Sequence, residues 1–156
     1  MSFINAKNYL KKYGLENNIM EFEGSSATVY DAAKAINCKE QEIVKTLSFI
    51  VDDRPILIAV SGSSKIDNSK FKVEFYTKAK MIPFDCVEKL IGHAAGGVCP
   101  FGINEDVDVY LDNSLKSSKI VYPACGSSNS AVKLTLDEFE KTSNYKKWID
   151  VCKDIQ

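Results

Sequence analysis

The sequence contains a single histidine and five cysteines scattered along the chain. No two cysteines form a C-x-x-C pair and their number is odd, which argues against a disulfide framework and indicates reduced thiols. A structural zinc site needs clustered ligands, and His93 lies far in sequence from any pair of cysteines. We therefore expect neither a metal ion nor another cofactor. The cysteines are Cys38, Cys86, Cys99, Cys125 and Cys152.

Long apolar runs and a large net charge are also absent. The stretch 56–60 is no longer than a β-strand, and residues 1–5 lack the charged and apolar regions of a signal peptide. With 20 basic and 21 acidic side chains the formal net charge is −1, so any contact with a nucleic acid must come from a local patch. We expect a cytoplasmic monomer that binds neither membranes nor DNA.

The length and composition are typical of one globular domain. The chain has 156 residues, of which 45% are hydrophobic and 26% are charged. A chain of this length can bury a sizeable core, so we expect a single domain over residues 1–156.

Helix and strand signals alternate along the chain. The pairs Thr28 with Asp31 and Thr135 with Glu138 resemble capping boxes, and apolar periodicity separates helices from strands. Segments 43–51 and 56–60 predict a hairpin at the sheet centre, and 119–122 is the expected neighbour of 107–111. The pattern favours an α/β fold with a mixed, curved and largely antiparallel sheet. Helices are expected over 3–13, 28–36, 67–75, 83–91 and from 135, and further strands at 19–22 and 131–134, before a polar tail.

A glycine-rich stretch, residues 92–102, lies between two apolar segments. It holds four glycines, Pro100 and His93. Glycine lets the backbone approach a ligand closely, and successive N–H groups in a turn form an anion-binding nest. The stretch is either a plain turn or a functional loop, and its glycine density favours the loop.

Lys45 has an unexpected position on the first hairpin strand. Alternation along 43–51 puts it on the same face as Ile43 and Leu47, although a lysine is seldom buried without a partner. Its ammonium either reaches solvent over the sheet edge or lines a cleft and meets an anionic ligand.

A second loop of small residues, 123–130, supplies further candidate chemistry. Together with the glycine-rich loop and Lys45 it could form a pocket of backbone donors around an ester. A Ser-His-Asp triad is poorly supported, because His93 is the only histidine and is expected to face solvent or end a helix. Cys99 is expected to be a small buried residue, and a Ser127–Lys45 dyad ranks below a non-covalent mechanism.

Three motifs in this order resemble the YbaK/ProX family of aminoacyl-tRNA deacylases, which are related to the editing domain of bacterial prolyl-tRNA synthetase. The motifs are Ile-Val-Lys-Thr-Leu at 43–47 with its hairpin, Gly-Gly-Val-Cys-Pro-Phe-Gly at 96–102, and Ala-Cys-Gly at 124–126. The resemblance extends from about residue 27 to residue 139.

The resemblance implies hydrolysis of the ester that joins a wrong amino acid to the 3′-terminal ribose of a tRNA, with no cofactor. The family's essential lysine corresponds to Lys45, which would hold a phosphate of the terminal adenosine or the acyl end. The partners implied are the acceptor end of a mischarged tRNA and an aminoacyl-tRNA synthetase. The residues expected to bind substrate are Thr46, Gly96, Gly97, Gly126, Ser127 and Ser128.

The sequence departs from the alanine-specific branch of this family at one place. That branch has a histidine just after the second loop, where Ser127 and Ser128 stand in this chain. Alanine, cysteine, serine and threonine therefore all stay open as the amino acid removed. The alternative function is a non-catalytic module that binds tRNA or a synthetase in the same groove.

Overall fold

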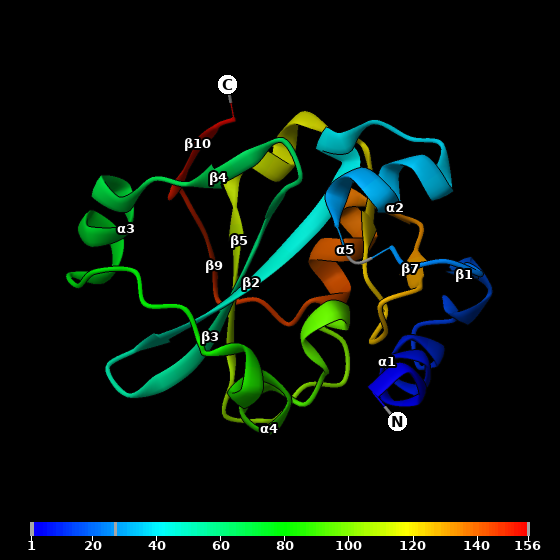
Figure 1. Cartoon of the computed structure of the whole chain (residues 1–156), viewed down its shortest axis with the longest axis horizontal. Helices are drawn as coiled ribbons and strands as arrows, with labels where there is room; N and C mark the ends of the chain where they lie inside the picture. The colour runs from blue at the N-terminus through cyan, green and yellow to red at the C-terminus, as the bar shows by residue number, and fades with distance from the viewer. Residues whose placement is uncertain (1, 27, 156) are drawn as a thin grey trace.

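The computed structural model describes residues 2–26 and 28–155, and its centre is a six-stranded mixed sheet (Figure 1). The strand order is β8-β6-β2-β3-β5-β9, so the β2–β3 hairpin lies at the middle, as predicted. These strands are β2 (Ile43–Val51), β3 (Arg54–Ser61), β5 (Asp108–Asp112), β6 (Ile120–Pro123), β8 (Leu134–Thr135) and β9 (Lys147–Ile149).

Two short antiparallel ladders flank the main sheet. One joins β1 (Ile19–Glu21) to β7 (Ser130–Val132), and the other joins β4 (Ser64–Ile66) to β10 (Cys152–Asp154). Among the described residues four of the seven ladders are antiparallel, including the longest, β2–β3. The expected class, a curved mixed sheet flanked by helices, is confirmed.

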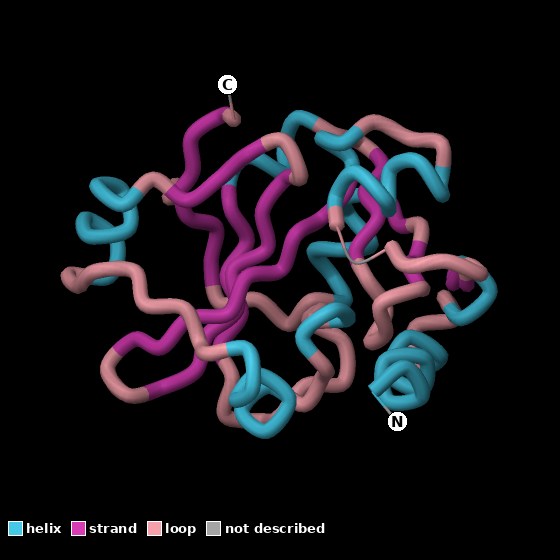
Figure 2. Tube along the Cα trace, in the orientation of Figure 1, coloured by secondary structure: helices cyan, strands magenta, loops and turns pink. Residues whose placement is uncertain are grey.

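The helices lie around the strands (Figure 2). The α-helices are α1 (Ser2–Lys11), α2 (Val29–Ile36), α3 (Asn68–Phe75), α4 (Val87–Ile91) and α5 (Leu136–Thr142). Short 3-10 turns are η1 (Glu16–Asn18), η2 (Glu40–Glu42), η3 (Phe84–Cys86), η4 (Ala95–Gly97) and η5 (Asn113–Ser117). None of the described helices has the length and apolar character needed to cross a membrane.

Both faces of the sheet are buried, because alternate residues of β3 enter two different core clusters. Leu57 and Ala59 pack with residues of α1, α4 and α5, whereas Ile56 and Ile58 pack with Phe71 of α3. This two-sided burial explains why residues 56–60 form one continuous apolar run.

The hairpin owes its register to a tight turn. Asp52 and Asp53 both have positive φ, 51° and 62°, as a two-residue type I′ turn requires. Val51 is therefore opposite Arg54, and the pairing continues without a break to Val44 opposite Ser61.

Three predictions about strands were wrong. Residues 120–123 pair with β2 rather than with β5, whose neighbours are β3 and β9. Residues 131–134 do not form one strand but divide between β7 and β8, which belong to different sheets. The polar tail contributes two strands, β9 and β10.

Candidate functional site

One edge of β2 carries a short gap in its hydrogen-bonded neighbours. At its start β2 pairs with β6 through Ile43 and Val44. Further along, Ser48 accepts a bond from the N–H of Ile82 (3.1 Å) and the N–H of Ile50 donates to Lys80 (2.9 Å). Residues 45–47 lie between these two paired stretches.

The register shows which backbone groups face the gap. The N–H of Gly62 donates to the carbonyl of Ile43 (2.7 Å), so odd-numbered residues of β2 exchange bonds with β3 and even-numbered residues point outward. The N–H and C=O of Thr46 therefore face the gap, and neither has a hydrogen bond to any residue within 2–26 or 28–155.

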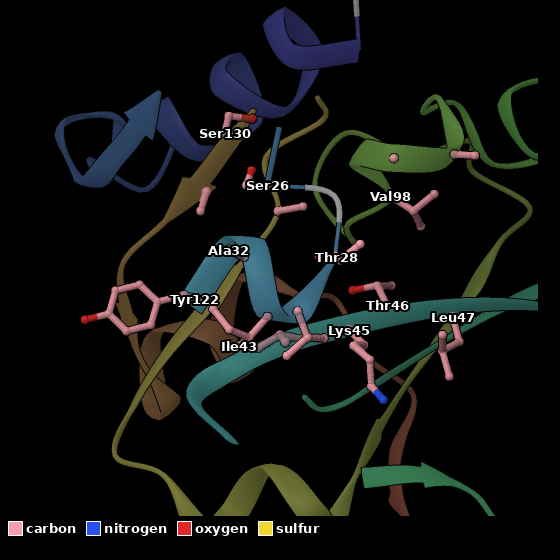
Figure 3. Close-up of a pocket in the computed structure, with 16 residues that line it drawn as sticks. Ser26, Thr28, Ala32, Ile43, Lys45, Thr46, Leu47, Val98, Tyr122 and Ser130 are labelled. Carbon is pink, nitrogen blue, oxygen red and sulfur yellow. The ribbon is translucent and has the colours of Figure 1, made fainter. Parts of the chain in front are cut away.

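A cavity of about 320 Å³ opens at this gap (Figure 3). Its volume is at the lower end of the range for small-molecule sites. Its walls come from the loop before α2, from α2, from β2, from the glycine-rich loop and from the segments around the second loop. The lining residues are Ser26, Thr28, Val29, Ala32, Ile43, Val44, Lys45, Thr46, Leu47, Ala95, Gly96, Val98, Tyr122, Ala124, Ser130 and Ala131.

The Thr46 hydroxyl points into this cavity (Figure 3). Its Oγ1 is buried and has no hydrogen-bond partner among the described residues. A buried hydroxyl without a partner is costly, and it is satisfied when a ligand supplies the missing group. Thr46 thus presents three polar groups, two from its backbone and one from its side chain, on the gap side of β2.

Lys45 lies on the opposite side of β2 from the Thr46 hydroxyl (Figure 3). Its Nζ donates a hydrogen bond to the backbone carbonyl of Ser64 in β4. Partial burial lowers the pKa of Lys45, while the neighbouring Cys152 thiol acts in the opposite direction. Lys45 is among the residues that line the cavity, but its half-buried ammonium is held by the Ser64 carbonyl on the other side of β2, so the structure shows it neither free in solvent nor inside the cleft.

The two glycine-containing loops are in direct backbone contact. The N–H of Gly126 donates to the carbonyl of Gly97 (3.0 Å), and a Cβ on Gly97 would lie 2.3 Å from the backbone nitrogen of Ser127. Gly97 has no positive φ and is absent from the cavity lining, so its role is to admit the second loop. Gly96, which has no side chain, lines the cavity with backbone atoms alone.

The second loop supports the cavity from behind. Gly126 has φ +84° and packs against Ser2 of α1, whose hydroxyl donates to its carbonyl. The Ser127 hydroxyl is bonded to Asn129 Oδ1 (2.9 Å) and to the Ser130 hydroxyl (2.6 Å). Ser127, engaged in this way, makes no dyad with Lys45.

Ser128 connects the second loop to the loop before α2. Its carbonyl accepts bonds from the N–H (2.5 Å) and the hydroxyl (3.1 Å) of Ser26. Of the expected substrate-binding residues, Thr46 and Gly96 reach the cavity together with Lys45. Gly97, Gly126, Ser127 and Ser128 form the layer beneath it.

His93 is fully buried and therefore does not face solvent; it directly follows Gly92, the C-cap of α4, as the other alternative, a residue at a helix end, predicted. Its Nε2 bonds to the carbonyl of Phe101 (2.5 Å) and lies 3.5 Å from the Cys99 Sγ. Its Nδ1 has no hydrogen-bond partner among the described residues. Burial lowers the pKa of His93, and the bond to Phe101 opposes that shift. His93 therefore braces the glycine-rich loop from inside as a neutral imidazole.

The cysteines near the loops are unsuited to nucleophilic attack. Cys99 and Cys125 are buried, as expected for Cys99. Burial raises the pKa of both thiols, that of Cys125 to about 12, so they are protonated near neutral pH. The cavity lining contains no carboxylate, histidine or cysteine among the described residues.

Sequence reasoning missed most of the cavity wall. Ser26, Thr28 and Ala32 precede or begin α2, and Tyr122 comes from β6. Thr28 carried a signal, since its hydroxyl caps α2 by accepting from Asp31 N–H, but a helix cap does not show what the helix faces.

The chain is similar to known proteins over most of its length. Residues 23–142 match the sequence model of the family described as "Aminoacyl-tRNA editing domain". The chain is 47% identical to the uncharacterized protein YwhH of Bacillus subtilis (strain 168), over 155 residues that cover 99% of each chain. A proline–tRNA ligase of the same organism is 26% identical over 91 residues, which are 58% of this chain and 16% of the ligase.

Solved structures show the same fold. A crystal structure described as a candidate trans-editing enzyme for prolyl-tRNA synthetase has a TM-score of 0.87 and 26% identity, with 97% of each chain covered. The hypothetical protein APE2540 has a TM-score of 0.84 at 23% identity, with 96% of this chain and 99% of that chain covered.

Proposed function

This chain belongs to the aminoacyl-tRNA editing domain family, and from that premise we propose that it hydrolyses the ester of a mischarged tRNA in the cavity beside β2. The observation that carries the proposal is the gap at Thr46. Three unpartnered polar groups of one residue converge on a small cavity whose opposite wall is the glycine-rich loop.

The reaction requires an attack on the carbonyl carbon of the ester. A water oxygen bonds to this carbon, the bond from the carbon to the ribose oxygen breaks, and a proton from the water passes to the ribose oxygen. The products are a free amino acid and an uncharged tRNA. Backbone donors aimed at the developing oxyanion are each worth about 10²–10³ in rate, so the site needs no side-chain triad.

The lining favours this non-covalent mechanism. Lys45 and Tyr122 are the titratable side chains that the described part of the cavity wall contains. Burial raises the pKa of Tyr122 and lowers that of Lys45. Neither side chain is a nucleophile of the kind that forms an acyl-enzyme at neutral pH with an adjacent base.

Lys45 contributes a positive charge near the tRNA end. Its long flexible stem can carry the ammonium from the Ser64 carbonyl to the mouth of the cavity, where it meets a phosphate of the terminal adenosine or the acyl end. Thr46 then orients the aminoacyl group through its hydroxyl and its backbone.

The size and character of the cavity favour a small amino acid. Its walls mix alanine and valine side chains with the hydroxyl groups of Ser26, Thr28 and Ser130. Alanine, cysteine, serine and threonine all suit such walls, because a pocket separates side chains that differ by one methylene by only about 10- to 200-fold.

The test is incubation of the purified protein with a panel of tRNAs that carry these four amino acids. Release of one free amino acid well above the rate without protein supports the proposal and identifies the substrate. Binding of tRNA without release of any of the four would instead indicate the non-catalytic binding module.

A Thr46→Val variant links the activity to the cavity. The two side chains have nearly the same shape, and removing an unpartnered buried hydroxyl should not destabilise the protein. We expect an unfolding midpoint at least as high as that of the wild type, with clearly slower deacylation. If this variant deacylates tRNA at the wild-type rate, the Thr46 hydroxyl takes no part in the reaction.

A further inference from the structure

An exposed segment runs along the same edge of β2 just beyond the gap. Residues 78–84, called the strap below, are fixed to β2 by the bonds of Lys80 with Ile50 and of Ile82 with Ser48. Met81 forms an antiparallel bridge with Phe49 between these bonds. The strap therefore continues the edge that the cavity interrupts.

The strap presents apolar side chains to solvent. Phe84 is 83% exposed and Met81 is 57% exposed, and Pro83 between them is also exposed. Isolated exposed apolar residues are common, but several in one short segment beside a cavity mark an interaction surface. Ile82 points the other way and is buried, so the backbone of the strap is firmly anchored.

Positive charges accompany these apolar groups. Lys78 and Lys80 are exposed, and neither forms an ion pair with any residue the structure describes. Asp85 is the exposed acidic residue next to Phe84. An exposed aromatic ring with free lysines suits a single-stranded nucleic acid, whose bases stack on the ring while its phosphates meet the ammonium groups.

The direction of the strap agrees with such a ligand. Because it is antiparallel to β2, it proceeds from the level of Ile50 at Lys80 towards the gap, and turns into η3 at Phe84. Ile50 is four residue steps along the strand from Thr46, about 13 Å at the usual rise. Stacked nucleotides advance about 3.4 Å each, so about four of them span the same length.

We infer that the strap binds the unpaired 3′ end of the tRNA, with a base stacked on Phe84 and phosphates near Lys78 and Lys80. This inference rests on the proposed function, since it assumes that the esterified 3′ end enters the cavity. The apolar side chains on the strap would then contribute affinity for tRNA, because a net charge of −1 gives no general electrostatic attraction to a polyanion.

The experiment measures binding of uncharged RNA, so it does not depend on hydrolysis. The probes are a fluorescent acceptor-stem minihelix with its unpaired 3′ nucleotides and the same minihelix without them, both followed by anisotropy. For Phe84→Ala we expect about tenfold weaker binding of the complete minihelix and unchanged binding of the shortened one. Phe84→Trp should retain the affinity.

Two further variants locate the contacts. Tyr76→Ala is the matched control, because Tyr76 is 92% exposed at the end of α3 but lies outside the strap. It should bind like the wild type. Lys80→Gln should reduce the slope of log affinity against log salt by about 0.7, as expected for the loss of one phosphate contact on a single strand.

The inference is overturned if the wild type does not distinguish the two RNAs, or if Phe84→Ala binds the complete minihelix as tightly as the wild type does. An equal loss with Tyr76→Ala would also overturn it. The exposed Phe84 side chain would then be assigned to contact with a protein partner instead of RNA. A different result separates this inference from the proposed function. If none of the four mischarged tRNAs is deacylated while binding of the complete minihelix still depends on Phe84, the proposed hydrolysis is refuted and the inference about the strap stands.

Discussion

Lys45 is held by a single polar contact, which makes its contribution separable from the fold. Its ammonium donates to the Ser64 carbonyl, and burial disfavours its charged form. The sequence placed Lys45 correctly on the same face of β2 as Leu47. It could not show the carbonyl that accepts from the ammonium, because Ser64 lies in β4, 19 residues further along the chain, and no local pattern links the two residues.

Replacing Lys45 with alanine should therefore abolish function without unfolding the protein. We expect deacylation to fall by about 10²-fold or more, the scale of one lost charged contact to a reacting group. Lys45→Arg should fail as well, because its broad planar guanidinium does not fit the place of an ammonium. Rates on the mischarged tRNA, with circular dichroism as the control for folding, test this. Full activity in a folded Lys45→Ala protein would contradict the assignment.

Gly97 is required for a reason that only the structure shows. The sequence predicts that glycines in this stretch let the backbone approach a ligand, whereas a Cβ on Gly97 would collide with the backbone of the second loop. Gly97→Ala should therefore destabilise the protein by about 1–3 kcal/mol, the usual range for overpacking a buried site. The matched control is Gly24→Ala, since a Cβ on Gly24 meets nothing within 4 Å. Equal urea midpoints for the two variants would rule out the collision.

His93 predicts how stability depends on pH. Its folded-state pKa lies below the ordinary value of 6.5, so the unfolded chain binds the proton more readily. Stability should fall as the pH drops below 6.5 towards the folded pKa, by at most about 1.4 kcal/mol per pH unit. The sequence has no other histidine, so His93→Gln should remove this dependence between pH 7.5 and 5.5. Urea unfolding across that range measures it, and equal slopes in both proteins would exclude His93 as the cause.

At the scale of elements, local signals in the sequence were reliable and long-range ones were not. The capping pairs act within four residues and the two hairpin strands are neighbours in the chain, and the helices and the hairpin predicted from them are present. The partner of β6 depends on a contact between residues about 80 apart, which alternation alone does not encode. For the same reason β9 and β10, short strands within a polar tail, could not be recognised.

The residues of the candidate site were likewise predictable where a local motif marks them and not where the tertiary fold brings them to the cavity. Residues in the glycine-rich loop and on β2 carry recognisable motifs, and Thr46 and Gly96 do reach the cavity. Wall residues from α2 and β6 carry no motif of their own. Their place at the site follows from how α2 and β6 are seated against β2, which is a property of the folded sheet.

The capping box of α5 provides a test confined to one element. Thr135 accepts from the N–H of Glu138 (3.0 Å), and the Glu138 carboxylate accepts from the N–H of Thr135 (2.9 Å). Thr135→Ala should cost about 1 kcal/mol of stability, whereas Thr135→Ser should retain most of it. Neither should alter deacylation, because Thr135 is absent from the cavity wall. A slower reaction in a stable Thr135→Ser protein would show that α5 is coupled to the site.

At the scale of the whole molecule, the matched family region is smaller than the unit that holds the site together. Residues 23–142 omit α1, whose Ala6 and Leu10 are fully buried, and β9, whose Ile149 completes the second core cluster. They also omit Ser2, which supports the second loop at Gly126.

A fragment of residues 23–142 should therefore not fold cooperatively. Loss of each large buried side chain removes about 1.5–3 kcal/mol, and the total stability of a domain is about 5–15 kcal/mol. Circular dichroism during urea titration should show a broad, non-cooperative change for the fragment and a sharp one for the full chain. A sharp transition with retained deacylation in the fragment would show that α1, β9 and β10 are dispensable.

The brevity of the gap in β2 has a consequence for self-association. An open sheet edge normally offers a row of free N–H and C=O groups on which another chain can add a strand, the first step towards aggregates. Here β6 pairs with β2 at Ile43 and Val44, and the strap bonds to it at Ser48 and Ile50, so only a short stretch of this edge around Thr46 lacks a neighbouring strand among the described residues. That stretch is too short a template for an added strand, so the edge stays open to a small ligand and closed to a second copy of the sheet.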